Sequence, residues 1–156
     1  MGQVDHAMRA RTATLLEEVT VDSNAVPEER RGPRRMLLVD DEPAVTEFIG
    51  QLAEEAGYAV KATHGADAFK AALASFRPDL IAIDLAMPGM DGIELLRYLA
   101  GEQCRTPILI ISGLDARVLD AAERLGGARG LNIAGVLSKP ARVATLRGIL
   151  VDLYTR

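Results

Sequence analysis

From residue 36 onward, short apolar runs alternate with longer segments in which apolar residues recur at helical spacing. The apolar runs have the length of buried strands and are bounded by polar or turn-forming residues. We predict strands at Met36–Val39, Tyr58–Thr63, Leu80–Asp84, Ile108–Ile111 and Ile133–Leu137. Helices are predicted between and after them, at Pro43–Ala56, Ala66–Phe76, Gly92–Glu102, Asp115–Ala128 and Arg142–Tyr154. This alternation predicts an α/β fold whose parallel strands are joined by right-handed crossovers.

The first of these helices has clear boundary signals. Pro43 stands at a helix start, where its missing N–H costs nothing, and Gly57 stands where the helix ends. The apolar face of this helix is predicted to consist of Phe48, Ile49, Leu52, Ala53 and Ala56.

Charged and hydroxyl side chains lie at or just beyond the ends of four predicted strands. Asp40 and Asp41 follow the first strand, Asp84 ends the third, and Ser112 and Lys139 follow the fourth and fifth. The carboxyl ends of parallel strands share one edge of a sheet, which is where ligands bind. Crowded carboxylates repel one another unless a cation lies among them, and an all-oxygen cluster suits a hard ion such as Mg²⁺. We therefore expect a magnesium site at this edge.

Together these motifs resemble the receiver domain of response regulators in two-component signalling. The matching segments are Asp40-Asp41, Asp84 with Met87-Pro88-Gly89-Met90-Asp91-Gly92 behind it, Ser112-Gly113, and Lys139-Pro140. The resemblance covers about residues 35–155. It implies a flavodoxin-like, doubly wound five-stranded parallel sheet of order 2-1-3-4-5 with five helices, whereas alternation alone would not fix that order.

The resemblance also implies a role for each site residue. Asp84 would be the phosphoacceptor, and Asp41 and Asp84 would bind Mg²⁺ directly. Asp40 would act mainly through a bound water, and the backbone carbonyl of Ala86 would complete the protein ligands of the ion.

Two further residues would act on the phosphoryl group. Lys139 would pair first with Asp84 and then with the phosphoryl group, and the hydroxyl of Ser112 would donate to a phosphoryl oxygen. In this family the peptide bond before a residue such as Pro140 is commonly cis. Many receivers carry Tyr or Phe three residues before the lysine, where this chain has Val136, so the usual aromatic switch is in doubt.

The function that the resemblance implies is a phosphorylation switch. A histidine kinase or a histidine phosphotransfer protein would donate the phosphoryl group to Asp84, and the output would be contact with another, unknown protein. Such a protein is not an enzyme in the usual sense, because it catalyses only its own phosphorylation and dephosphorylation. The last predicted helix ends near residue 156, so we expect a stand-alone receiver. A scaffold or sequestering module that works without phosphorylation remains an alternative, which Val136 favours and the set of Asp84, Ser112 and Lys139 opposes.

Composition narrows the partners and the compartment. A net charge of −4 argues against nucleic-acid binding through phosphate contacts. No apolar run approaches the ~20 residues that a membrane span requires, and no export signal opens the chain. The single cysteine, Cys104, fits a reducing environment. We therefore expect a cytoplasmic protein without a nucleic-acid or membrane partner.

Residues 1–34 differ in character from the rest and are predicted to be a tail and linker, with the receiver domain over residues 35–156. Prolines, a glycine and clustered charges from Thr20 to Arg35 predict a flexible linker. An interrupted apolar stripe before the linker allows a short amphipathic helix without establishing one. The stripe consists of Val4, Met8, Leu15 and Val19. Any such stripe would dock on the receiver or on a second chain, because a short helix is marginal in water, so a homodimer is left open too.

Overall fold

The computed structural model describes residues 32–87 and 90–156, and the residues from Pro33 to Arg156 form one compact unit. The stripe of Val4, Met8, Leu15 and Val19 lies outside the described residues. The main sheet contains β1 (Arg35–Val39), β2 (Ala59–Thr63), β3 (Leu80–Ile83), β6 (Ile108–Ser112) and β7 (Ile133–Ser138). The helices are α3 (Pro43–Glu55), α4 (Ala66–Phe76), α5 (Gly92–Gly101), α6 (Ala116–Ala128) and α7 (Val143–Tyr154).

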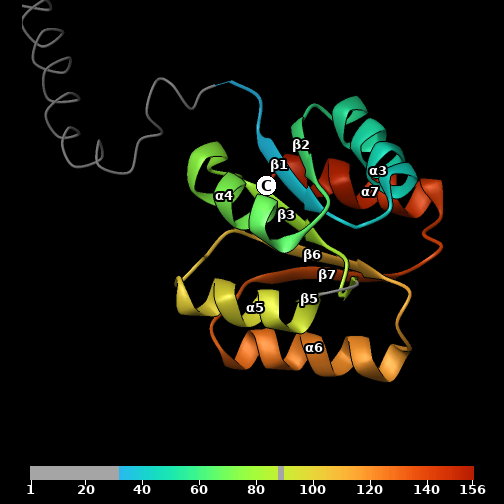
Figure 1. The fold of residues 1–156 in the computed structure, drawn as a ribbon. Helices are drawn as coiled ribbons and strands as arrows, with labels where there is room; N and C mark the ends of the chain where they lie inside the picture. Colours follow the sequence, from blue (N-terminus) through green and yellow to red (C-terminus); the bar gives the residue numbers. More distant parts are fainter. Residues whose placement is uncertain (1–31, 88–89) are drawn as a thin grey trace, which may run out of the picture. The chain divides into compact units, whose positions relative to one another are not determined.

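The five strands of the main sheet are all parallel and follow the order β2-β1-β3-β6-β7 (Figure 1). Numbered within this sheet alone, the order is 2-1-3-4-5, so the predicted flavodoxin-like topology is confirmed. β3 lies in the middle of the sheet, with two strands on either side of it. The residue that follows β3, Asp84, is therefore at the centre of the carboxyl edge.

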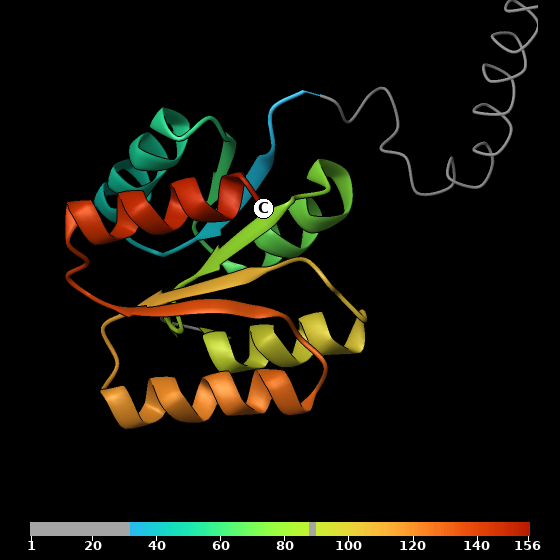
Figure 2. The ribbon, with the colours of Figure 1, turned by 180° about the vertical axis from the view of Figure 1, so that it is seen from behind.

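Helices cover both faces of the sheet, as the two opposite views in Figures 1 and 2 show. Side chains of α3 and α7 pack on one face, against strand residues such as Leu38 and Leu109. Side chains of α4, α5 and α6 pack on the other face, against Leu37 and Ile110, which adjoin Leu38 and Leu109 in the sequence. Because successive strand residues point to opposite faces, a continuous apolar run is what a strand buried on both faces requires.

The predicted apolar face of α3 needs one correction. Ile49, Leu52 and Ala53 are buried, as expected, and Ala56 packs against the same core cluster. Phe48, however, is 37% exposed and lies at the border of the packed face. The face of a helix that a twisted sheet can cover is narrower than the apolar stripe of α3, so its outermost ring is left in contact with solvent.

A short antiparallel ribbon follows Asp84 and was not predicted from the sequence. It pairs β4 (Ala86–Met87) with β5 (Met90–Asp91), and it ends at Gly92, where α5 begins. The N–H of Gly92 donates to the carbonyl oxygen of Leu85 at 2.9 Å. A Cβ atom at Gly92 would overlap the main chain of Leu85 and approach the carbonyl oxygen of Asp84 to 2.9 Å. A glycine is therefore needed here so that the chain can fold back tightly behind Asp84.

We predict that Gly92→Ala lowers the free energy of unfolding by about 1–3 kcal/mol, because the added methyl group must displace main chain rather than a flexible side chain. Gly101→Ala is the matched control at the other end of α5, where a Cβ atom meets nothing within 4 Å. That change should leave stability equal or slightly higher, since alanine is the better helix former. Chemical denaturation of both variants measures the difference, and equal stabilities would contradict the close approach at Gly92.

Candidate functional site

The carboxylates of Asp40 and Asp84 are fixed by the turns that follow their strands. Oδ1 of Asp40 accepts a hydrogen bond from the backbone N–H of Glu42 at 3.0 Å, and Oδ1 of Asp84 accepts one from Ala86 at 3.0 Å. Such bonds from an aspartate to the N–H two residues ahead are common where a strand gives way to a loop. Both residues are buried, at 1% and 4% exposed. The same local turn therefore aims both carboxylates inward along the carboxyl edge.

Lys139 connects these two carboxylates. Its Nζ donates to Oδ2 of Asp40 at 2.7 Å and to Oδ2 of Asp84 at 3.1 Å. Each carboxylate thus uses one oxygen for its turn and offers the other oxygen to the ammonium group. Strand β7 carries the lysine to this point, and the backbone N–H of Lys139 donates to the carbonyl oxygen of Ser112 at 3.0 Å. The Lys139–Pro140 peptide bond is cis, as the family resemblance implied.

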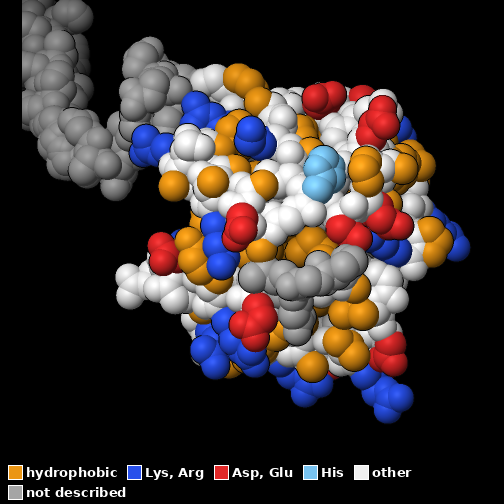
Figure 3. Space-filling model, viewed as in Figure 1, with side chains coloured by type: hydrophobic (Ala, Val, Ile, Leu, Met, Phe, Trp, Pro, Cys, Tyr) orange, Lys and Arg blue, Asp and Glu red, His pale blue; other side chains and the backbone are white. Residues whose placement is uncertain are grey.

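Asp41 completes an acidic cluster at the same edge. One carboxylate oxygen from each of Asp40, Asp41 and Asp84 lies within 4.8 Å of the others. Asp41 is half-buried, so the cluster is open on its side. Figure 3 shows acidic side chains spread over this face, some of them on its right-hand side, toward which β1 and β6 run in Figure 1. Three carboxylate oxygens at this spacing fit a small, hard divalent cation such as Mg²⁺.

Burial shifts the pKa of the acidic residue at the bottom of the cluster. Desolvation raises the pKa of Asp40, and the hydrogen bond from Lys139 only partly offsets it. The folded protein then holds this proton more tightly than the unfolded chain does. Protonated Asp40 therefore stabilises the fold below pH 3.8, and this contribution is lost as the pH rises through the raised pKa. At neutral pH the charged Asp40 costs the fold free energy, which a nearby cation reduces.

The same contacts act in the opposite direction on the lysine. Burial alone would lower the pKa of Lys139, but the hydrogen bonds to Asp40 and Asp84 outweigh it and raise the pKa above 10.5. Lys139 is thus fully charged at neutral pH. Its charge stabilises the fold below pH 10.5 and ceases to do so as the pH rises through the raised pKa.

The other residues singled out in the sequence differ in the contacts that they make. Ser112 is fully buried, and its Oγ accepts a long hydrogen bond of 3.4 Å from the N–H of Leu114. Ala86 contacts Asp84 through its N–H, while the proposed role of its carbonyl oxygen as a metal ligand stays a prediction. Val136 is half-buried and packs against the core on the side of α4, α5 and α6. A branched aliphatic side chain there fills space but has no ring that could change rotamer.

Two features of the site were missed at the level of sequence. Glu42 follows the acidic pair directly, and its Oε1 lies 3.7 Å from Nζ of Lys139. A run of three acids was visible in the sequence, but the third could equally have been a solvated residue at the start of α3. The contact depends on a lysine almost a hundred residues away, and only the fold reveals it.

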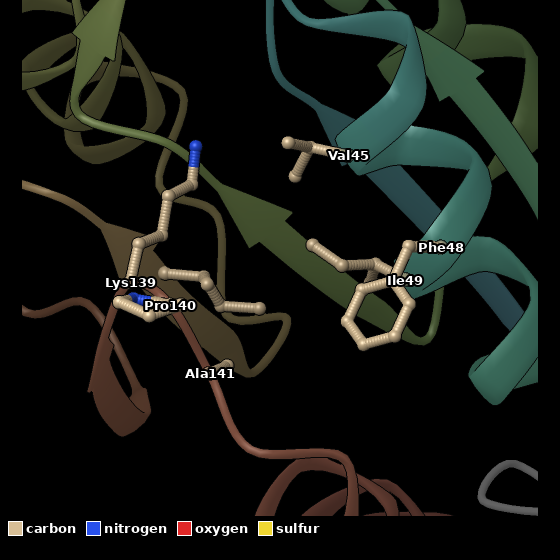
Figure 4. A pocket seen from close by; sticks show the side chains of 7 residues that line it. Val45, Phe48, Ile49, Lys139, Pro140 and Ala141 are labelled. Carbon is tan, nitrogen blue, oxygen red and sulfur yellow. The ribbon is translucent and has the colours of Figure 1, made fainter.

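The second missed feature is an apolar hollow of about 500 Å³ beside Lys139. Figure 4 shows Val45, Phe48 and Ile49 of α3 on one side, facing Lys139, Pro140 and Ala141 on the other. The exposed ring of Phe48 is part of this wall. Lys139 therefore borders both the apolar hollow, which it lines, and the acidic cluster, which its Nζ contacts.

Comparisons with known proteins identify the family of this chain. A family model described as the response regulator receiver domain matches residues 36–150. This chain belongs to that family. The matched range includes Asp40, Asp84 and Lys139. Among the described residues, no helix is long and apolar enough to cross a membrane.

Individual relatives show the same likeness over part of their length. The chain is 32% identical over 118 residues to the transcriptional regulatory protein TrcR of Mycobacterium tuberculosis, which covers 76% of this chain and 46% of TrcR. It is 34% identical over 124 residues to the sensory/regulatory protein RpfC of Xanthomonas campestris, covering 76% of this chain and 16% of RpfC. In both cases the chain spans less than half the length of the curated relative that it matches.

Solved structures agree on the fold. The crystal structure of a response regulator from Colwellia psychrerythraea matches with a TM-score of 0.68 and 30% sequence identity, covering 80% of this chain and 99% of that chain. The Francisella response regulator 1452 receiver domain matches with a TM-score of 0.66 and 29% identity, covering 80% and 98% respectively.

If Lys139 and Mg²⁺ neutralise the same carboxylates, the loss of one should increase the stabilising effect of the other. Lys139→Met should lower the free energy of unfolding without Mg²⁺ by about 1–3 kcal/mol, because it leaves two buried carboxylates without their cation. Added Mg²⁺ should then raise the melting temperature of the variant more than that of the unaltered protein. Lys61→Met, at an exposed position of β2, is the control and should do neither. Equal Mg²⁺ responses in all three proteins would show that the carboxylates and Lys139 do not share one cation site.

Proposed function

We propose that this chain is a phosphorylation switch in which Asp84 accepts a phosphoryl group in a Mg²⁺-dependent reaction. The observation that carries the proposal is the position of the Asp84 carboxylate, which follows the central strand, lies beside the carboxylates of Asp40 and Asp41, and contacts the partly buried Lys139. Its Oδ1 is committed to the turn, and its Oδ2 contacts a group that can move. A carboxylate held in this way is suited to in-line attack on phosphorus.

The metal would be held by Asp40, Asp41 and Asp84, together with the backbone carbonyl of Ala86. When bound, Mg²⁺ neutralises the charge that spreads over the phosphoryl oxygens during transfer. The residues fit this task because three carboxylates converge at the open edge and two of them are buried.

Lys139 and Ser112 would recognise the transferred group. The ammonium of Lys139 leaves Asp84 Oδ2 and pairs with a phosphoryl oxygen, which carries more negative charge than the carboxylate it leaves. The Oγ of Ser112 accepts a long hydrogen bond from the N–H of Leu114, and this bond does not use the hydroxyl proton that would be donated to the same group. Because Val136 has no ring, the response to phosphorylation would not use an aromatic rotamer change at this position.

The proposed partners are proteins. A histidine kinase or histidine phosphotransfer protein in the cytoplasm would donate the phosphoryl group, and another protein would receive the output. The apolar hollow between α3 and the Lys139–Ala141 segment would receive an apolar side chain of the donor, since it lies directly beside Lys139. The exposed ring of Phe48 supports this use, because a large apolar group at the mouth of the site gains free energy when a partner covers it.

A scaffold that works without phosphorylation is the second candidate, and Val136 is the observation that favours it. The contacts of Lys139 favour the switch more strongly, since a scaffold gains nothing from holding two buried carboxylates on a lysine.

The first test is direct labelling. Acetyl phosphate with Mg²⁺ should add one phosphoryl group to the protein, as intact mass shows, and none to Asp84→Asn. Asp67→Asn, which removes an exposed carboxylate from the first turn of α4, should be labelled normally. Labelling of Asp84→Asn to the same extent would overturn the assignment.

The second test separates donor contact from chemistry. Phe48→Ser should slow transfer from a phosphorylated histidine phosphotransfer protein about tenfold or more, because it removes apolar area from the contact. Labelling by acetyl phosphate should be unchanged in this variant. Val151→Ser, at a 45% exposed position on α7, is the matched control for losing surface apolar area. If Phe48→Ser slowed both donors equally, the hollow would be part of the chemical site rather than a docking surface.

A further inference from the structure

Lys139 contacts a third carboxylate, that of Glu42, and this contact differs from the other two. Nζ of Lys139 lies 2.7 Å from Asp40, 3.1 Å from Asp84 and 3.7 Å from Glu42. The side chains of Asp40 and Asp84 are 2% and 5% exposed, that of Lys139 is 20% exposed, and that of Glu42 is 63% exposed. Exposure therefore rises from the two buried aspartates through Lys139 to Glu42, which is the most exposed of the four groups.

The position of Glu42 serves no evident purpose in the fold. Glu42 is the N-cap residue of α3, but its side chain makes no capping hydrogen bond. Only its backbone is used locally: its N–H donates to Asp40, and its carbonyl oxygen accepts from Val45 and Thr46. The carboxylate is thus left at the mouth of the site, beside the lysine that would receive the phosphoryl group.

A donor has to reach Asp84 from the open side, because its other surroundings are buried. Any phosphodonor therefore brings its charge close to Glu42 before transfer. A negative charge at this position repels an anion more strongly the more charge the anion carries, and the two also compete for the same ammonium group.

We infer that Glu42 is a specificity-determining residue, which disfavours phosphodonors with an anionic leaving group relative to donors whose leaving group departs as a neutral nitrogen base. The inference rests on the proposed phosphoryl transfer to Asp84. A phosphohistidine belongs to the favoured class, whereas acyl phosphates belong to the disfavoured class.

The two classes can be compared with two small molecules. In each reaction an oxygen of Asp84 forms a bond to phosphorus while the bond from phosphorus to the leaving group breaks. Acetyl phosphate, a dianion, releases acetate, which keeps the bonding electron pair and leaves as an anion. Phosphoramidate, a monoanion whose amino group is protonated, releases neutral ammonia with the electron pair. Glu42 thus faces a departing anion in the first reaction and a departing neutral molecule in the second.

The expected effect of Glu42→Gln is a faster reaction with acetyl phosphate, by about two- to tenfold at low ionic strength for a charge this close to the site. The reaction with phosphoramidate should accelerate less, so the ratio of the two rates should rise at least about twofold. The gain should shrink as salt is added, because exposed charges are screened.

The test measures labelling rates by intact mass with both donors, each at a Mg²⁺ concentration shown to be saturating for the variant in use. Glu42→Asp keeps the charge and should keep a rate ratio close to that of the unaltered protein. Glu54→Gln removes the same charge from an exposed position at the other end of α3 and should change neither rate. Melting temperatures confirm that every variant is folded.

Failure of the inference and failure of the proposed function give different results. If neither donor labels the unaltered protein, the proposed function is wrong. If both donors label it at Asp84 but Glu42→Gln leaves the rate ratio unchanged, Glu42 has no part in selecting the donor. Equal acceleration of both donors has the same meaning, since it would show only a general effect on Lys139.

Discussion

The site depends on the need to hold two buried carboxylates, Asp40 and Asp84, close together at the end of the sheet. Their mutual repulsion and desolvation must be offset by a cation, and Lys139 is the cation that the chain itself provides. It can do so because β7 runs parallel to β6 and delivers the lysine to the same edge. In the proposed function, a metal ion and a phosphoryl group would together take over both contacts of Lys139.

This exchange of partners would link the stability of the fold to its function. Because burial raises the pKa of Asp40, the charged form of this residue costs the fold free energy at neutral pH, and a bound cation would reduce that cost. The turn at Gly92 supports the same edge from behind, because the chain could not otherwise fold back so close to Leu85. Glu42 and Phe48 are more exposed, so a partner that approaches Asp84 would contact the charge of Glu42 and the apolar ring of Phe48.

Much of this architecture could be predicted from sequence, because strands buried on both faces appear as unbroken apolar runs with their chemistry at the end. The family resemblance supplied the strand order, which alternation alone could not. The β4–β5 ribbon was missed because strands of two residues leave no periodic signal. The exposure of Phe48 was missed because an apolar stripe does not show how much of it a sheet will cover. The contact between Glu42 and Lys139 joins distant residues, so only the folded chain reveals it.

The most direct test of the central claim is the pKa of the Lys139 ammonium group, followed by NMR through its side-chain nitrogen in three states. In the metal-free protein this pKa should lie above 10.5, because Asp40 and Asp84 both bind the ammonium. Saturating Mg²⁺ should lower it, since the ion then neutralises those carboxylates. Beryllofluoride, added as a phosphoryl analogue, should raise it again by providing a new anionic partner. A pKa that stays the same in all three states would contradict the account, because Lys139 would then not exchange its partners at Asp84.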